Sequence, residues 1–256
     1  MSVPALEAQA LCKSFGGVRA AVDVSFAVPA RTLTAIIGPN GAGKTTLFNL
    51  ITHLFAADSG EVRFFGASLA GLAPGEIAAR GLIRTFQSAR IFPGMTVLEN
   101  ALVGAHLQAR APALSQMLWL PSARREEREL AARARSLLEM AGISGHARTA
   151  ANELPIGAQK LLEIVRALMA RPKVMLLDEP AAGLNDAETG ELAALLRAVR
   201  ASGVTVLVVE HNMSLVMGVA DQVIVLDAGS IVASGTPAEI QRNPRVVEAY
   251  VGQDLL

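Results

Sequence analysis

The stretch that decides the fold runs from residue 33 to residue 46 and reads Leu33-Thr34-Ala35-Ile36-Ile37-Gly38-Pro39-Asn40-Gly41-Ala42-Gly43-Lys44-Thr45-Thr46. Its first five residues form a short apolar run of the kind found in buried strands, and residues 45–54 have a helical pattern. Residues 38–46 fit the spacing G-x-x-x-x-G-K-[ST]. A strand, a glycine-rich turn and a helix in this order predict a loop that binds phosphate groups.

The residue types in this loop account for the prediction. Glycines let the backbone curl, so that successive N–H groups converge on phosphate oxygens at the positive end of the helix dipole. Lys44 adds a full positive charge near the β- and γ-phosphates, and the Thr45 hydroxyl is suited to bind Mg²⁺. The alternative is a plain turn with a solvated lysine, which the flanking strand and helix disfavour. The predicted nucleotide-binding residues are Gly38, Pro39, Asn40, Gly41, Ala42, Gly43, Lys44, Thr45 and Thr46.

Three further apolar runs predict more strands of the same sheet. They are residues 174–177, 204–209 and 222–227, and helical patterns separate them. Apolar runs separated by helical patterns are typical of a parallel sheet that is covered on both faces. The first 30 residues differ, because apolar and other residues alternate from 22 to 28 after a Gly16-Gly17 turn, which predicts antiparallel strands. The expected fold class is α/β, with a mainly parallel sheet and an N-terminal antiparallel β subdomain.

The middle of the chain is predicted to be an inserted helical subdomain. Between residues 85 and 152 the patterns are helical, beginning with a capping box from Thr96 to Glu99. A second helix is expected over residues 124–142, with Glu129 four residues before Arg133 and with Gly142 as its stop. The expected apolar faces are Leu98, Ala101, Leu102 and Ala105 on the first helix and Leu130, Ala134, Leu137, Leu138 and Ala141 on the second. We therefore expect one domain, with its core in residues 1–86 and 159–256 and the insertion in residues 87–158.

Polar side chains follow two of the predicted parallel strands. Asp178 ends the strand that starts at residue 174, at the carboxyl edge where ligands bind in such sheets, and it is placed to hold Mg²⁺. Glu179 comes next and is expected to polarise an attacking water. His211 follows the strand 204–209 and reaches the same edge, where it can sense the terminal phosphate. The alternative reading of each is a solvated or structural residue at a strand end.

Composition narrows the class of protein. Lys and Arg number 23 and Asp and Glu number 23, so no basic surplus points to nucleic-acid binding. The single cysteine, Cys12, is a poor metal ligand and fits a reducing cytosol. The N-terminal residues have no cationic start followed by an apolar run, so they do not resemble an export signal. The apolar runs also fall short of the roughly 20 residues that span a bilayer.

Together these elements resemble, over essentially the whole chain, the ATP-binding subunit of an ABC transporter. The resemblance implies ATP and Mg²⁺ as ligands, with Phe15 stacking on adenine and Gln87 touching Mg²⁺ and the water. It implies that residues 182–185 cross to an opposing subunit. It also places the family signature at Leu154, Pro155, Ile156, Gly157 and Ala158, which cap the γ-phosphate of a nucleotide on the facing subunit. The catalytic set is then Glu179, His211 and Gln87, and the metal set is Thr45, Gln87 and Asp178.

The signature departs from the family pattern at one position. The family usually has serine where this chain has Pro155, and proline offers neither a hydroxyl nor a backbone N–H. The contact across the dimer then rests on the N–H groups around Gly157 and on the dipole of a helix expected over residues 159–170. We expect the composite site that this signature caps to be the weaker of two in a heterodimer.

Within the family, the chain most resembles the larger ATPase subunit of branched-chain amino-acid importers. This resemblance implies that the chain hydrolyses ATP to power the import of branched-chain or other hydrophobic amino acids. The segments that carry this resemblance are residues 84–87, 92–100, 209–213 and 248–252, together with an insertion over residues 106–128 that includes Trp119. The insertion is equally well explained as a packed hairpin. The implied partners are a second ATPase subunit, or a second copy in isolation, two membrane permeases and, indirectly, an exported solute-binding protein. The implied location is peripheral, at the cytoplasmic face of the inner membrane.

Four alternatives stay open on the sequence. A urea or amide importer of the same subfamily would have the same motifs. A soluble ABC ATPase usually has two cassettes, a long coiled coil or a basic face, which this chain lacks. A cassette that binds ATP without turnover would not need Glu179 and His211. A P-loop kinase would not explain Gly157 or residues 182–185.

Overall fold

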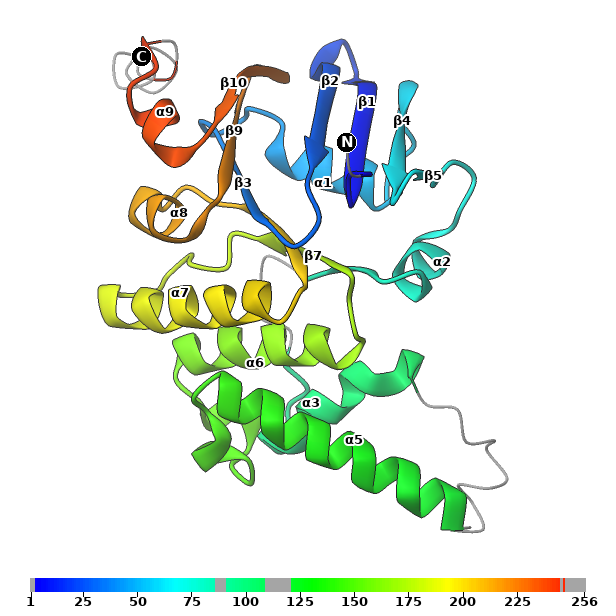
Figure 1. Cartoon of the computed structure of the whole chain (residues 1–256), viewed down its shortest axis with the longest axis vertical. Coiled ribbons are helices and arrows are strands. Elements are labelled where there is room, and N and C mark those ends of the chain that lie inside the picture. The colour runs from blue at the N-terminus through cyan, green and yellow to red at the C-terminus, as the bar shows by residue number, and fades with distance from the viewer. Residues whose placement is uncertain (1–2, 86–90, 109–120, 245, 247–256) are drawn as a thin grey trace. The chain divides into compact units, whose positions relative to one another are not determined.

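The computed structural model describes residues 3–85, 91–108, 121–244 and 246 of the chain (Figure 1). Contacts between Cα atoms divide the chain into two units. The first, here called the sheet unit, comprises residues 1–87, 173–182 and 196–256. The second, the helical unit, comprises residues 88–172 and 183–195.

The first strands of the sheet unit form an antiparallel sheet, as the alternation at the N-terminus predicts. Its strands are β1 (Leu6–Phe15), β2 (Val18–Val28), β4 (Ser59–Phe64) and β5 (Ala67–Ser68). They are ordered β2-β1-β4-β5, and every neighbouring pair is antiparallel. Gly16 and Gly17 make the β1–β2 turn with positive φ angles of 51° and 91°, which glycine adopts readily.

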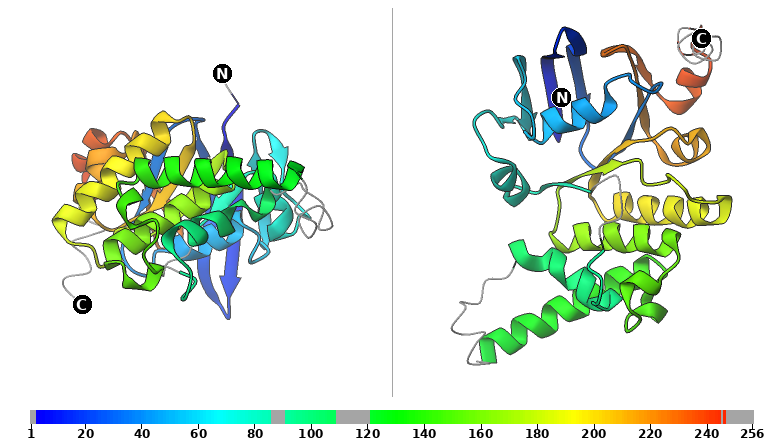
Figure 2. Two further views of the ribbon diagram at one scale, coloured as in Figure 1. Left: turned by 90° about the horizontal axis from the view of Figure 1, so that it is seen from below. Right: turned by 180° about the vertical axis from the view of Figure 1, so that it is seen from behind.

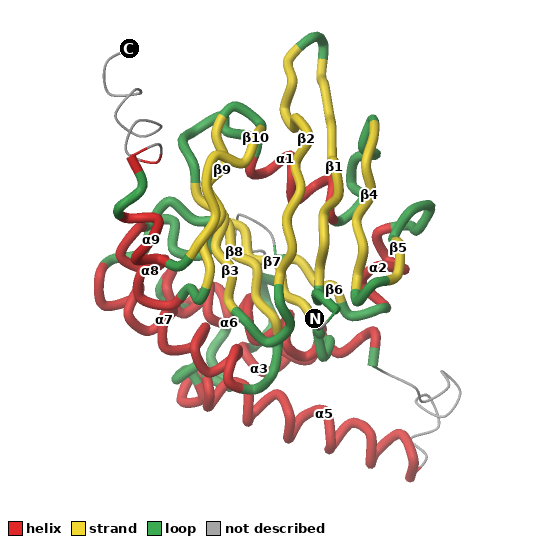
Figure 3. The backbone as a smooth tube through the Cα atoms, turned by 45° about the horizontal axis from the view of Figure 1, so that its top comes forward, coloured by secondary structure: helices red, strands yellow, loops and turns green. Residues whose placement is uncertain are grey.

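A second, six-stranded sheet carries the site. Its strands are β3 (Leu33–Ile37), β6 (Leu82–Arg84), β7 (Val174–Asp178), β8 (Thr205–Val209), β9 (Gln222–Asp227) and β10 (Ser230–Gly235). The order is β10-β9-β3-β8-β7-β6, and only the β9–β10 pair is antiparallel (Figure 3). The mainly parallel sheet predicted from the apolar runs is confirmed.

This strand order brings three chain segments to one edge. β8 lies between β3 and β7 and runs parallel to both, so the carboxyl ends of all three strands share an edge. The residues that follow them are the glycine-rich loop after β3, Glu179 after β7, and Glu210 and His211 after β8. Open parallel sheets bind ligands outside such carboxyl ends.

Short helices accompany the strands of the sheet unit. They are α1 (Lys44–Ile51), α2 (Pro74–Ala79), α8 (Met213–Val219) and α9 (Pro237–Gln241). α1 anchors the phosphate-binding loop, because Leu47, Phe48 and Ile51 belong to the same buried apolar cluster as Ile36 and Leu207 of the sheet. A capping box begins α9, since the Thr236 hydroxyl accepts from the Glu239 amide.

The helical unit contains no strand among its described residues. Its elements are α3 (Val97–Val103), α5 (Pro121–Met140), α6 (Ile156–Met169) and the 3₁₀ turns η1 (Gly104–Leu107), η2 (Ser144–His146) and η3 (Ala151–Glu153). α3, α5 and α6 pack on one another (Figure 2). α7 (Asp186–Ala201) begins in this unit, and its residues from Leu196 belong to the sheet unit.

Three details of the predicted helices are wrong. Val97 and Asn100, rather than Leu98, are buried on α3 beside Ala101, because the helix begins at residue 97 with its first side chain inward. Glu129 pairs with Arg125 at 2.9 Å, since Arg133 instead donates to the Leu168 carbonyl oxygen on α6. The helix expected from residue 159 begins at Ile156.

The boundary between the two units differs from the one expected from sequence. The expected boundary assigns all of residues 159–256 to the core. By contacts, residues 159–172 and 183–195 belong to the helical unit. The reason is packing: α6 carries its buried face against α3 and α5. In the part of the chain that the structure describes, no helix has the length and apolar character required to cross a membrane.

Candidate active site

The glycine-rich loop has two positions, Gly38 and Gly43, that leave no room for a side chain. A Cβ on Gly38 would overlap the Leu226 carbonyl oxygen, and one on Gly43 would overlap the Ala20 carbonyl oxygen. Gly43 also has a φ of 99° and is the N-cap of α1, with no side-chain cap. The first amides of α1 therefore have no side-chain acceptor at the cap, and helix geometry gives them none within the helix. They face the loop as donors for an anion.

Lys44 is folded against its own loop. Its side chain is buried, and its Nζ donates to the carbonyl oxygens of Gly38 at 2.7 Å and Pro39 at 2.8 Å. Burial lowers the pKa of Lys44, and the negative charges of Glu179 and Asp178 act in the opposite direction. The lysine thus lies within the electrostatic reach of both carboxylates.

Asp178 has one oxygen paired and one open. Arg84 donates to Oδ2 at 2.8 Å, and the same guanidinium donates to Asn49 Oδ1 at 2.6 Å. Oδ1 of Asp178 is buried and has no hydrogen-bond partner among the described residues. Arg84 lies on β6, beside β7, and sequence reasoning assigned it no contact with Asp178 because only the strand pairing makes them neighbours.

The residues present fit a bound magnesium ion. An unpaired, buried carboxylate oxygen is costly unless a donor or a cation satisfies it, and Mg²⁺ prefers oxygen ligands. Asp178 Oδ1 is such an oxygen. The Thr45 side chain, the second predicted ligand, is exposed at the start of α1. Gln87, the third predicted ligand and a predicted catalytic residue, lies outside the described residues.

Glu179 and His211 approach each other at the same edge. His211 Nδ1 lies 4.0 Å from Glu179 Oε2, and the two side chains are 59% and 22% exposed. Glu179 has a φ of 47°, an unusual conformation for a residue with a side chain, and its amide donates to the Val209 carbonyl oxygen at 2.9 Å. Strained backbone of this kind costs about 1–3 kcal/mol and tends to occur at functional sites.

Phe15 is held at the end of β1 by its neighbours. Its ring meets the Phe55 ring edge-on, with centroids 5.6 Å apart, and the Lys13 Nζ lies 5.5 Å from its centroid. Asp58 fixes this segment by accepting from Lys13 Nζ and from the Ser14 amide, both at 2.7 Å. The hydrogen bond from Lys13, followed by that from Ser14, lowers the pKa of Asp58. Sequence reasoning missed Phe55, and no motif marks it.

The signature residues form the start of α6 in the helical unit. Pro155 is the N-cap and provides no side-chain hydrogen bond, so the amides of residues 156–158 open the helix without a side-chain cap. Ile156 is exposed, whereas Gly157 is buried. A Cβ on Gly157 would come within 2.6 Å of Glu188 Oε1 on α7, so the glycine allows this close packing.

The structure therefore assembles part of the predicted site. Residues 38–46, Asp178, Glu179 and His211 come together at one edge in the sheet unit, and Phe15 belongs to the same unit. Residues 154–158 belong to the helical unit.

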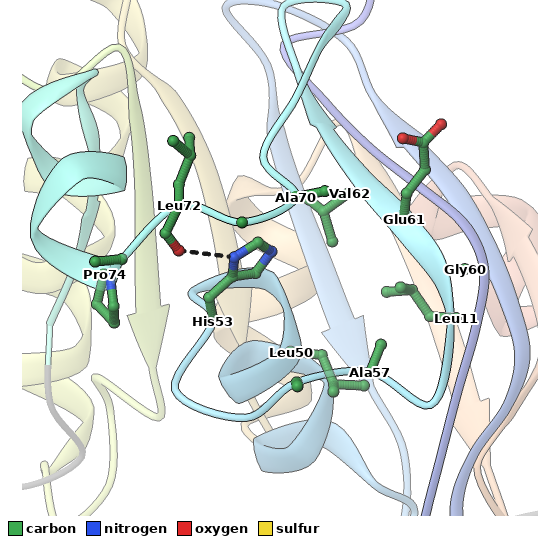
Figure 4. Close-up of a pocket in the computed structure, with 13 residues that line it drawn as sticks. Leu11, Leu50, His53, Ala57, Gly60, Glu61, Val62, Ala70, Leu72 and Pro74 are labelled. Atoms are coloured by element: carbon green, nitrogen blue, oxygen red, sulfur yellow. Dashed lines mark hydrogen bonds between the residues drawn. The ribbon is translucent and has the colours of Figure 1, made fainter.

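A separate cavity of about 520 Å³ lies beside the end of α1 (Figure 4). It is lined mainly by small and apolar residues, among them Leu50, Ala57 and Leu72. The ring nitrogen Nδ1 of His53 lies 3.1 Å from the Leu72 carbonyl oxygen. None of the predicted site residues lines this cavity.

Known sequences match the chain over its full length. Residues 21–182 match the family model described as ABC transporter, and residues 230–255 match the one described as branched-chain amino acid ATP-binding cassette transporter. The chain is 42% identical to the high-affinity branched-chain amino acid transport ATP-binding protein BraF of Pseudomonas aeruginosa, covering 99% of this chain and 100% of that protein. Identity and coverage are the same for the protein LivG of Escherichia coli with the corresponding description.

Solved structures match as well. A nucleotide-free ATP-binding cassette from an ABC transporter aligns with a TM-score of 0.80 at 35% identity, covering 98% of this chain and 99% of that one. A cassette in its ADP conformation aligns with a TM-score of 0.83 at 34% identity and the same coverage. The resemblance and the fold class predicted from the motifs are confirmed, and this chain belongs to the ABC transporter family as one of its ATP-binding subunits.

Proposed function

We propose that this chain is the ATP-hydrolysing subunit of an importer for branched-chain amino acids. One observation carries the chemistry: the phosphate-binding loop, Asp178, Glu179 and His211 lie at the same edge of one sheet. The solute is supported by the names of full-length relatives and by the match of residues 230–255.

The roles follow from charge and position. The amides at the start of α1 and the Lys44 ammonium bind the phosphates of ATP and neutralise their charge. To do so, Lys44 exchanges its bonds to the Gly38 and Pro39 carbonyl oxygens for phosphate oxygens. Asp178 and Thr45 are the described residues that would hold Mg²⁺, and the ion would neutralise charge that develops on the phosphates. Phe15, exposed at the end of β1, offers a face for adenine.

Hydrolysis needs a positioned water. Glu179 holds and orients this water and accepts its proton, while His211 donates a hydrogen bond to the terminal phosphate. Both side chains are partly exposed at the sheet edge, so they reach a ligand there without rearrangement of β7 or β8.

We further propose that two ATPase subunits enclose the nucleotides between them. Each phosphate-binding loop faces the signature segment of the other subunit, where the uncapped amides of residues 156–158 donate hydrogen bonds to the γ-phosphate. Loss of the γ-phosphate removes this bridge, and the pair opens. This motion is passed to two membrane permeases, with the chain bound peripherally at the cytoplasmic face of the inner membrane and an exported binding protein delivering the solute.

Transport by the assembled complex tests the solute assignment. In vesicles that contain the permeases, both ATPase subunits and the solute-binding protein, uptake of radiolabelled leucine, isoleucine or valine should require ATP. Excess unlabelled branched-chain amino acid should abolish the signal, and excess urea should leave it unchanged. ATP-dependent uptake of urea or an amide, with none of leucine, would contradict the assignment while leaving the ATPase role intact.

The proline of the signature predicts unequal composite sites. Lys44→Ala in this subunit disables the site that the partner's signature caps, whereas the corresponding lysine change in the partner disables the site that Pro155 caps. Because Pro155 removes a charge-assisted hydrogen bond of roughly 1.5–3 kcal/mol, the complex with the altered partner should keep the higher ATPase rate.

Phosphate release by the two complexes measures this difference. Pro155→Ser supplies the missing hydroxyl and amide, so it should bring the two residual rates closer together. Equal residual rates before that change would contradict the asymmetry.

A further inference from the structure

Glu210 is a fully buried acidic residue at the edge that carries the site. It directly follows β8, its side chain and backbone are 0% exposed, and its amide donates to the Ile36 carbonyl oxygen of β3 at 3.2 Å. Glu210 belongs to the segment 209–213 that carries the family resemblance, but no role proposed above uses its side chain. Acidic side chains are almost never fully buried unless partners satisfy them.

Its partners are three backbone amides. Oε1 accepts from the Ala181 amide at 2.6 Å, and Oε2 accepts from the amides of His211 at 3.0 Å and Asn212 at 3.1 Å. Within the described parts of the chain, no Lys, Arg or His side chain forms an ion pair with it. An ionised carboxylate only accepts, which matches a site that presents only donors. The side chain thus ties the segment after β7 to the segment after β8.

The first of these segments contains Glu179. Glu179 has a φ of 47°, and its amide is bonded to the Val209 carbonyl oxygen. The Ala182 amide donates back to the Glu179 carbonyl oxygen at 3.1 Å, so the turn closes around Ala181. A strained conformation persists only when its surroundings fix it. The bond from Ala181 to Glu210 is one such restraint, two residues beyond the strained position.

The second segment contains His211. Glu210 accepts from the amide of His211 and from that of Asn212, and Asn212 in turn caps α8 by accepting from the Leu215 amide at 3.0 Å. The backbone of His211 is therefore fixed between the end of β8 and the start of α8. The same carboxylate that restrains the turn after Glu179 also restrains this backbone.

We propose that Glu210 is a positioning residue that holds Glu179 and His211 in one rigid arrangement. It touches neither the water nor the phosphate, and it acts through the two residues that do. The loop 182–185, which the family resemblance places against the second subunit, begins directly after the Ala181 amide that Glu210 holds. Movement of that loop on closure is therefore passed to the hydrolytic residues through this carboxylate. The proposal rests on the proposed function of the site.

The test is Glu210→Gln in the assembled transporter, compared with Glu179→Gln, His211→Ala and the double variant Glu210→Gln/His211→Ala. Glutamine has the same shape but turns one acceptor into a donor that faces an N–H group. Because it leaves Lys44 and Phe15 in place, KM for ATP should change less than about twofold. The value of kcat should fall about 10- to 100-fold, as expected for loss of a charge-assisted hydrogen bond.

The double variant separates positioning from mere structural support. If Glu210 acts through His211, the loss in the double variant is smaller than the product of the two single losses. A structural role alone predicts losses that multiply and a kcat that falls only with the folded fraction. Multiplying losses, or a kcat unchanged in Glu210→Gln, would overturn the proposal.

Asp221→Asn is the matched control. Asp221 also accepts a strand amide, from Leu33 at 2.8 Å, and pairs with Arg200, but it lies at the amino end of β3. This variant should lose thermal stability, should keep kcat within about twofold, and should combine multiplicatively with His211→Ala. If Glu210→Gln does not assemble, Glu210→Asp, which keeps the charge but is one methylene shorter, is measured in the same way.

Hydrogen exchange gives a readout that does not depend on turnover. In the wild-type complex without nucleotide, the amides of Ala181, His211 and Asn212 should exchange slowly, and Glu210→Gln should accelerate all three together while Asp221→Asn does not. If these three amides exchanged independently of one another, or at unchanged rates in Glu210→Gln, the proposal that the Glu210 carboxylate joins the two segments would be refuted. If the wild-type complex failed to hydrolyse ATP, the proposed function would be refuted instead. The exchange rates would still test the contacts of Glu210, because they do not depend on turnover.

Discussion

Lys44→Ala is expected to abolish tight ATP binding by the purified chain and to lower hydrolysis roughly 10³-fold or more. The physical reason is the position of the ammonium group. Lys44 is 7% exposed, so its charge acts at reduced screening, and it sits where the phosphate-binding loop and two carboxylates converge. Alanine leaves the loop amides in place but removes the only full positive charge that the loop provides.

Equilibrium binding of ATP with magnesium and release of phosphate measure the two effects. The matched control is Lys173→Ala, a lysine that directly precedes β7 at the amino edge of the sheet and lies over the Phe65 ring. That variant should bind and hydrolyse ATP as the wild type does. Retention of wild-type affinity by Lys44→Ala would remove the foundation of the proposed function.

Glu179→Gln is expected to separate binding from chemistry. The amide keeps the shape of the side chain but cannot take the proton of the attacking water, so hydrolysis should fall about 10²- to 10⁴-fold. ATP binding should persist, because the phosphate-binding loop and Lys44 are untouched. Since the γ-phosphate then remains, the closed pair of subunits should accumulate.

Size-exclusion chromatography with ATP and magnesium detects that pair. Glu61→Gln is a suitable control, since Glu61 lies on β4 of the antiparallel sheet, where it accepts from Arg63 and Ser68. The control should turn ATP over and elute as the wild type does. If Glu179→Gln hydrolysed ATP at the wild-type rate, another residue would have to accept the proton of the attacking water.

The strands that sequence predicts best are those with continuous apolar runs. β3 and β9 have the expected bounds, because a continuous run of buried apolar residues in a parallel sheet carries no competing pattern. β6, by contrast, is only three residues long and ends in Arg84, so no periodicity marks it. It becomes a strand by pairing with β7, a partner about 90 residues away.

The same distinction applies to the site. The spacing of residues 38–46 and the placement of Asp178, Glu179 and His211 after apolar runs identify them as candidates. The ion pair of Arg84 with Asp178, the contact of Phe55 with Phe15, and the three amides around Glu210 depend on contacts between distant segments. No local pattern encodes such contacts.

By itself, the sequence determined the order of strand, loop and helix around Lys44, because periodicity and glycine content act within a few residues. It also determined the family, through the order of its motifs. Only the tertiary structure decided which acceptor of Asp178 stays open, where the backbone of Glu179 is strained and what satisfies Glu210. The physical reason is that hydrogen-bond partners and burial arise from strand order, which joins segments that are remote along the chain.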